Sequence, residues 1–304
     1  MRCLQSRRVF PAALVLACTM TGNAEVLAQS PEVTSAQASA SIAIPGVVGA
    51  AAAYGRIEDD RDGFLGTTRW HQESVSGDMR LGSGWLGLTL NHTRSSKDLD
   101  EHTLSSGADA GARVFGGTSK TVTQGIVLRG GTTIGAASVG AFVGYDRGET
   151  EESRAGGGVS ANWERDVLTR SFGGYVSTLI ELGDGWYAVP AAQYIWSRTV
   201  SDATTDSLGR AVPEERDLLI RGLFGGEIGH QGFAGELIAT SGLRAYLVHD
   251  FHRFRNFADA SGVDLGAFFT LGGERLSAGL EVTATVGRSD TDSASGRLFV
   301  SWRF

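Results

Sequence analysis

The last thirty residues show the clearest alternation of apolar and polar positions in the chain. From 275 to 286 every even position is apolar, and every odd position is polar or small. A two-residue period places successive side chains on opposite faces of an extended strand, so this segment is predicted to be a β-strand with one apolar face. Residues 296–304 repeat the pattern, with Phe299 as the one exception. Their apolar face carries Leu298, Val300, Trp302 and Phe304.

The same alternation recurs upstream and predicts about twelve strands. Their approximate bounds are 47–57, 70–81, 85–96, 118–129, 133–146, 165–182, 186–200, 215–229, 242–254, 263–271, 274–287 and 294–304. Glycine tolerates the positive φ of tight turns, and this residue type predicts them at 82–84, 130–131, 183–185 and 272–273. A longer turn is expected at 230–241. The remaining connections are wide and acidic, at 58–60, 98–101, 149–152, 202–206 and 290–292.

Short turns at one end and long polar loops at the other are typical of a transmembrane β-barrel with lipid outside and water inside. The predicted fold class is therefore all-β: an antiparallel up-and-down transmembrane barrel of about twelve strands over residues 47–304. No run of about 18 apolar residues follows the N-terminal segment, which argues against a helical membrane protein. The 43 glycines and five prolines suit such a barrel.

The N-terminal segment has the features of an export signal. Arg2, Arg7 and Arg8 precede a short apolar stretch, and Ala28 closes a small-residue cleavage pattern, so residues 1–28 are predicted to be a signal peptide. A competing cut before Cys18 loosely resembles lipoprotein processing. Both cysteines lie in this segment, and cleavage after Ala28 would leave a chain without thiols or disulfides. Residues 29–46, rich in Ala and Ser, are predicted to be either a linker or a short helix inside the lumen.

Aromatic residues on one strand match the height of a bilayer. Trp186, Tyr194 and Trp196 share a face, and the two tryptophans are ten residues apart. At about 3.3 Å per residue and a tilt near 40°, that separation is roughly 25 Å along the membrane normal, close to the distance between two aromatic girdles. Pro190 lies between them and lacks a backbone N–H, so an irregularity of the strand is expected there.

The opposite parity defines a predicted lumen face that carries charges of both signs. Its members are Asp78, Arg80, Arg221, Glu227, Arg244, Asp250, His252, Arg275, Glu281, Arg297 and Arg303. These side chains either line and partly block a narrow pore or form structural ion pairs without a transport role. The net charge of −7 argues against nucleic acid as a partner.

The closing strand, with Leu298, Val300, Trp302 and a terminal Phe304, resembles the signal that the barrel assembly machinery reads in outer-membrane proteins. Together with the strand number and the 190–194 segment, it makes the chain similar to the translocator domain of autotransporters. The resemblance implies a bacterial outer-membrane location, contact with lipid and lipopolysaccharide, and a structural or porin-like role. Fewer than about twenty residues separate the predicted cut from the first strand, too few for a folded passenger.

Two alternative functions use other residues. A surface adhesin or lipopolysaccharide-contacting barrel would act through acidic loops at 97–117 and 147–164. An omptin-like protease would bring Asp98 and Asp100 together with Asp250 and His252 at the outer rim to activate a water. Glu58, Asp60 and Asp62 imitate the start of a calcium loop, but Arg69 occupies the position of its bidentate glutamate. No catalytic residue, metal or cofactor is predicted.

Overall fold

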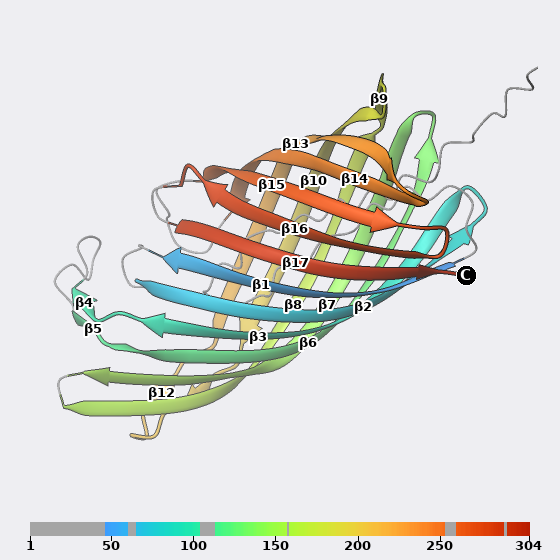
Figure 1. Ribbon diagram of the computed structural model, residues 1–304. Coiled ribbons are helices and arrows are strands. Elements are labelled where there is room, and N and C mark those ends of the chain that lie inside the picture. The colour runs from blue at the N-terminus through green and yellow to red at the C-terminus, as the bar shows by residue number, and fades with distance from the viewer. Residues whose placement is uncertain (1–45, 60–64, 104–112, 157, 253–259, 289–290) are drawn as a thin grey trace, which may run out of the picture.

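The described part of the chain forms one closed antiparallel barrel (Figure 1). The computed structural model describes residues 46–59, 65–103, 113–156, 158–252, 260–288 and 291–304. Sequential strands pair around the wall from β13 through β17 to β1 and on to β10, and the pairing of β10 with β13 closes the ring. Within these residues no helix is long and apolar enough to cross a membrane.

The twelve wall strands match the twelve predicted from the sequence. They are β1 (Gly46–Asp59), β2 (Gly66–Leu81), β3 (Gly84–Leu99), β6 (Gly116–Ile134), β7 (Ala137–Gly156), β8 (Val159–Thr178), β10 (Trp186–Ser201), β13 (Glu215–Ala234), β14 (Leu237–His252), β15 (Ser261–Gly272), β16 (Leu276–Val286) and β17 (Thr291–Arg303). The short β9 (Ile180–Gly183) continues β8 along β10. Two small hairpins pair β4 (His102–Thr103) with β5 (Arg113–Val114) and β11 (Thr204–Thr205) with β12 (Ala211–Val212).

The two ends of the barrel differ in their connections. One end, here the turn rim, carries the tight turns near residues 82, 135, 184, 235 and 274, and the backbone N–H of Phe304 donates to the carbonyl of Gly46 there over 3.2 Å. The other end, the loop rim, carries the longer connections and both small hairpins. Both ends of the described wall, at 46 and 304, therefore meet at the turn rim, as expected for an even number of strands.

Three predicted connections were wrong. Gly130 and Gly131 continue β6, whose turn comes at residue 135, and the turn expected over 230–241 is a tight one near residue 235. The acidic stretch 149–152 continues β7, so residues 147–156 and 159–164 pair as parts of β7 and β8 at the loop rim rather than forming a loop. Beyond the apolar belt both faces of a strand are polar, and the two-residue period disappears although backbone pairing continues.

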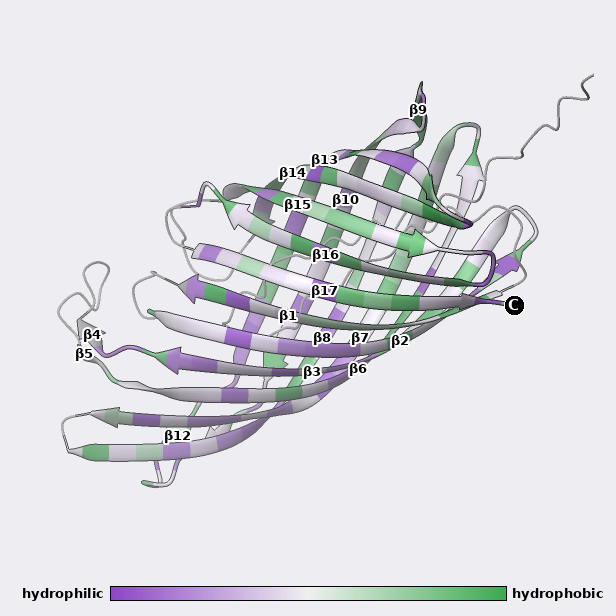
Figure 2. Ribbon diagram, viewed as in Figure 1, coloured by the Kyte–Doolittle hydropathy of each residue, from purple (hydrophilic) through white to green (hydrophobic). Residues whose placement is uncertain are grey.

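The wall is apolar outside and polar inside. Figure 2 shows that hydrophobic and hydrophilic residues both occur along the wall strands. On β16, for example, Leu280 and Val282 are 44% and 52% exposed on the outer face, whereas Glu281 and Thr285 are 2% and 3% exposed on the inner face. A soluble barrel would reverse this arrangement, because water would then surround its outer face. The outer surface of this barrel is therefore suited to hydrocarbon.

Pro190 lies at an interruption of the sheet, as expected. Ala191 pairs with Ser177 of β8, and Ala188 pairs with Ile180 of β9 in the same register, but the ladder between them lacks its pairs. Proline cannot donate the missing hydrogen bond, which explains the break between β8 and β9. On the other side, Pro190 stays in regular register with β13.

Glycines on the lumen face of a strand leave space for side chains of the two neighbouring strands to meet over it. The Asp78 carboxylate on β2 and the Arg129 guanidinium on β6 meet over the intervening strand β3 at Gly87. A Cβ at Gly87 would overlap the carboxylate and would lie 2.8 Å from Arg129 Nε. On β15, a Cβ at Gly266 would lie 2.7 Å from Arg244 Cγ, where Arg244 of β14 crosses to Glu281 of β16.

We expect Gly87→Val to destabilise the barrel by about 1–3 kcal/mol, because the new side chain displaces the buried ion pair. The measurement is urea unfolding in lipid vesicles, followed by the shift of the folded band on unheated gels. Gly77→Val is the matched control, since a Cβ there meets only the Val47 carbonyl at 4.0 Å. Equal unfolding midpoints for the two variants would contradict the role assigned to Gly87.

Candidate functional site

A charged network lies on the inner wall near the loop rim. The Arg221 guanidinium on β13 donates to Asp250 on β14, from Nε over 2.5 Å and from Nη2 over 3.1 Å. Arg288, which follows β16, reaches the same carboxylate over 3.0 Å by crossing β15 at Gly262. The Asp250 side chain is fully buried, and both guanidinium groups pair with its carboxylate.

A second network lies in the half of the lumen nearer the turn rim. Arg244 forms a buried ion pair with Glu281, and Glu227 on the neighbouring strand is 7% exposed on the same inner face. These three side chains, with Tyr187 and Arg303, line a cavity of about 50 Å³. That volume is enough for ordered water between these side chains.

A third ion pair lies across β3. The Arg129 guanidinium binds Asp78 in a bidentate manner, with both carboxylate oxygens 2.9 Å from Nη2, and its Cζ lies 5.7 Å from the centre of the Trp85 ring. Nearby, Arg297 of β17 lies over the Phe299 ring at 5.7 Å. Phe299, the exception to the alternation of the last strand, points inward and fills the space above Gly279.

The remaining predicted lumen charges lie at the rims. Arg80 is exposed at the turn rim, where its Nε donates to the Gly82 carbonyl over 3.0 Å. Arg275 precedes β16 and is exposed, and Arg303 is half-buried at the end of β17. His252 is exposed at the loop end of β14. The eleven predicted residues therefore do not form one continuous lining.

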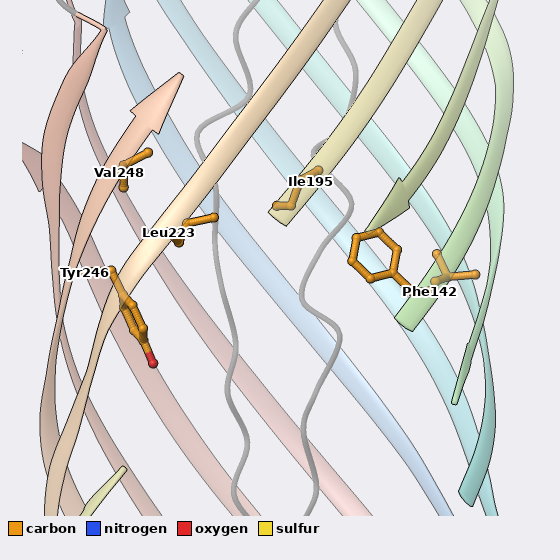
Figure 3. Packing of buried hydrophobic residues seen from close by; sticks show 6 residues of the cluster. Phe142, Ile195, Leu223, Tyr246 and Val248 are labelled. Carbon is orange, nitrogen blue, oxygen red and sulfur yellow. The ribbon is translucent and has the colours of Figure 1, made fainter. Parts of the chain in front are cut away.

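An apolar cluster on the inner wall departs from the predicted polar lumen. It consists of Val127, Phe142, Ile195, Leu223, Tyr246 and Val248, from strands β6, β7, β10, β13 and β14 (Figure 3). All are 7% exposed or less. The sequence pattern did not predict them, because every second residue of each strand was expected to face a water-filled lumen and therefore to be polar. The available signal was the continuous run Tyr246-Leu247-Val248, in which both parities are apolar.

The predicted girdle residues all lie on the outer face of β10. Trp186 is 50% exposed near the turn rim and packs edge-on against His230, with ring centres 5.1 Å apart. Tyr194 is 42% exposed, and Trp196 stacks on Phe172 of β8 with ring centres 4.9 Å apart. The predicted assembly-signal residues of β17 also face outward, and all are 48% exposed or more. They are Leu298, Val300, Trp302 and Phe304.

The predicted protease constellation is not assembled. Asp98 is exposed on the outer face of β3 and pairs with Arg69 over 3.0 Å, whereas Asp250 is buried on the inner face of β14. β3 and β14 lie six strands apart around a twelve-stranded wall, on opposite sides of the barrel. Glu58 of the calcium-like stretch pairs with Arg56, while Asp60 and Asp62 lie outside the described residues. In the described part of the chain, no group of three or more His, Cys, Asp or Glu suits a metal ion.

One loop-rim carboxylate organises the connection between β10 and β13. Asp206 accepts hydrogen bonds from the backbone N–H groups of Leu208 and Arg210, both over 2.9 Å, and from Arg210 Nε over 2.7 Å. Desolvation of this carboxylate acts to raise its pKa, but the hydrogen bonds from Arg210 and Leu208 and the charge of Arg210 outweigh it, and the pKa lies below its ordinary value of 3.8.

The predicted signal peptide, residues 1–28, and residues 29–45 of the predicted linker or lumenal helix lie outside the described residues. The described wall begins at Gly46, one residue before the expected start at 47.

We expect Asp250→Asn to destabilise the barrel by roughly 3–5 kcal/mol, because it removes the buried carboxylate charge that pairs with both Arg221 and Arg288. Urea unfolding in vesicles measures the loss. Glu58→Gln is the control, since Glu58 and Arg56 are both about half exposed and their pair is worth at most about 1 kcal/mol. A loss no larger for Asp250→Asn than for Glu58→Gln would refute the assigned network.

We expect the hydrogen bonds of the 206–210 turn to persist above pH 3.8 and to be lost as the pH falls through the lower pKa of the folded state. The sign follows from the lowered pKa, since protonation removes the acceptor charge. Hydrogen-exchange protection of the Leu208 and Arg210 amides, compared with Asp206→Asn at each pH, measures the effect. Protection that does not change between pH 6 and pH 2 would contradict it.

Comparisons with known proteins identify the fold. No family model matches the sequence, and no curated protein does. The translocator domain of the autotransporter NalP from Neisseria meningitidis superposes with a TM-score of 0.69 at 14% identity, over 85% of this chain and 88% of that one. The β-domain of the Bordetella autotransporter Brka superposes with a TM-score of 0.64 at 18% identity, over 86% of this chain and 100% of that one.

The transport unit of the autotransporter AIDA-I from Escherichia coli gives a TM-score of 0.62 at 14% identity, over 84% of this chain and 90% of that one. Identities this low establish the architecture and nothing about a passenger or solute. The apolar outer wall, the polar inner wall and these three likenesses agree with one another. The chain therefore has the fold of an autotransporter translocator, a closed twelve-stranded antiparallel β-barrel of the outer-membrane type.

Proposed function

We propose that this protein is an outer-membrane β-barrel of the translocator type that forms a narrow, charged pore through the membrane. The main supporting observation is the distribution of side chains on the wall. Apolar side chains lie on the outer face, and paired charged side chains lie on the inner face. Charged groups on an inner wall have a favourable environment only where water reaches the lumen or where they pair with each other.

The positions of the ion pairs support a pore that is constricted rather than empty. Each ion pair lies along the wall. The pairs of Asp78 with Arg129 and of Arg244 with Glu281 each span one intervening strand. The pair of Arg221 with Asp250 joins adjacent strands. Side chains that lie along the wall narrow the lumen without crossing it. The network therefore also has a structural role, since it ties together non-neighbouring strands of the wall.

We further propose that the barrel acts without catalysis of its own. The separation of Asp98 from Asp250 by half the circumference removes the best catalytic candidate of the sequence. Asp250 is also engaged in buried ion pairs with both Arg221 and Arg288, which suits a structural role rather than that of a general base.

The outward-facing end of β17 supports the proposal that the barrel assembly machinery inserts this chain. Leu298, Val300, Trp302 and Phe304 form an apolar row that ends at the turn rim, next to the first strand of the wall. In a barrel that closes by pairing β1 with β17, this row is accessible before closure and borders the seam afterwards.

We expect the purified barrel to conduct ions in planar lipid bilayers, and the double change Arg244→Gln with Glu281→Gln to increase its conductance. The double variant removes a charge pair from the lumen while leaving the net charge unchanged. Val282→Ala, on the outer face of the same strand, is the control and should conduct as the parent does. Correctly folded, inserted protein that carries no ionic current would eliminate the pore and leave only the structural role.

A further inference from the structure

A basic patch lies on the outer face of the barrel at the loop-rim end of β7, β8 and β10. It consists of Arg147, Arg170 and Arg198, all exposed, with Arg147 at 68% for its side chain. Arg198 pairs directly with Arg170 across β10 and β8, and Tyr145, two residues before Arg147, pairs with Arg170 across β8 and β7. Like charges at directly opposed positions of a sheet repel, so this arrangement is unfavourable unless an anion lies between them.

Arg170 and Arg198 of the patch differ from other outward-facing arginines, which have polar or charged partners. Arg56 pairs with Glu58, Arg69 pairs with Asp98, and Arg94 donates to His92 over 3.0 Å. Within the patch, Arg147 has Asp166 at 3.5 Å. Neither Arg170 nor Arg198 has an ion-pair partner among the residues that the structure describes. Two guanidinium groups therefore remain available to a ligand.

An aromatic surface continues the patch towards the middle of the membrane. Trp196 lies two residues before Arg198 on β10, and Phe172 lies two residues after Arg170 on β8. The two rings stack on each other, and Tyr145 adjoins them on β7. Phe172 and Tyr145 are 47% and 45% exposed on the outer face. The order along the barrel axis is thus apolar rings first and cations next, which is the order of acyl chains and headgroup in a lipid leaflet.

A cavity of about 380 Å³ lies on this surface. The three arginines, Tyr145, Leu168 and Val200 line it, together with the carboxylates of Asp166 and Asp202. Its volume suits a sugar phosphate rather than a single ion. Guanidinium groups bind phosphate in bidentate geometry, and carboxylates accept hydrogen bonds from sugar hydroxyls.

We propose that this patch is a binding site for a phosphorylated glycolipid of the outer leaflet, the lipid A part of lipopolysaccharide. Its phosphate lies between Arg170 and Arg198, with Arg147 as a third cation, and its acyl chains pack on Phe172, Trp196 and Tyr145. The site is independent of the lumen, because all these side chains face away from it. It gives the barrel one preferred lipid contact rather than a uniform lipid annulus.

The test measures lipid binding to the folded barrel by native mass spectrometry in detergent. The probes are bisphosphorylated lipid A, the same lipid without phosphates, phosphatidylglycerol and inorganic phosphate. We expect one tightly bound lipid A, and binding at least about tenfold weaker in the triple variant Arg147→Gln, Arg170→Gln and Arg198→Gln. Removal of the phosphates should weaken binding to the parent protein by a similar factor.

The matched control changes Arg56, Arg69 and Arg94 to Gln, which removes three outward-facing cations from β1, β2 and β3. It should bind lipid A as the parent does, and heat-modifiable gel migration verifies that each variant is folded. Equal lipid A binding by the two triple variants would overturn the site. Equal binding of phosphatidylglycerol would overturn the glycolipid assignment, and displacement of lipid A by millimolar inorganic phosphate would show a simple anion site instead.

Discussion

Backbone hydrogen bonding is the constraint on which this structure depends. A strand in hydrocarbon has no water to satisfy its N–H and C=O groups, so every edge must be paired, and only a closed sheet achieves this. Here the pairings of β1 with β17 and of β10 with β13 close the ring. Closure also fixes which parity of each strand faces lipid, because a strand paired on both sides cannot rotate about its axis without losing its ladder.

Closure creates a second problem, which glycine solves. Large polar side chains on the inner wall need space to reach one another across an intervening strand. The chain places Gly87 beneath the pair of Asp78 and Arg129, and Gly266 beneath Arg244. Aromatic side chains use the same device, since Phe299 covers Gly279. The 43 glycines of the sequence therefore reflect lateral packing in the lumen as well as turns.

The inner and outer walls support separate roles because their chemistry is separated by the sheet itself. The lumen concentrates paired charges, in which Asp250 bridges Arg221 and Arg288, and these pairs narrow the channel while tying strands together. The outer wall is apolar except towards the loop rim, where Arg170 and Arg198 lie opposite each other without partners among the described residues. A pore through the lumen and a lipid contact on the outer wall can thus coexist without competing for residues.

The sequence by itself determined the class of fold, the number of strands and the outward parity of residues such as Trp196 and Trp302, because contact with hydrocarbon on one face imposes a period of two. It failed where that contrast is absent: at the loop rim, where β7 and β8 continue with both faces polar, and at Leu223 and Val248, which are apolar inside the lumen. Only the tertiary structure decided which charges meet. Asp78 and Arg129 are 51 residues apart, and Asp98 and Asp250 are separated by half the barrel, because strand order and register set those distances, and no local pattern encodes them.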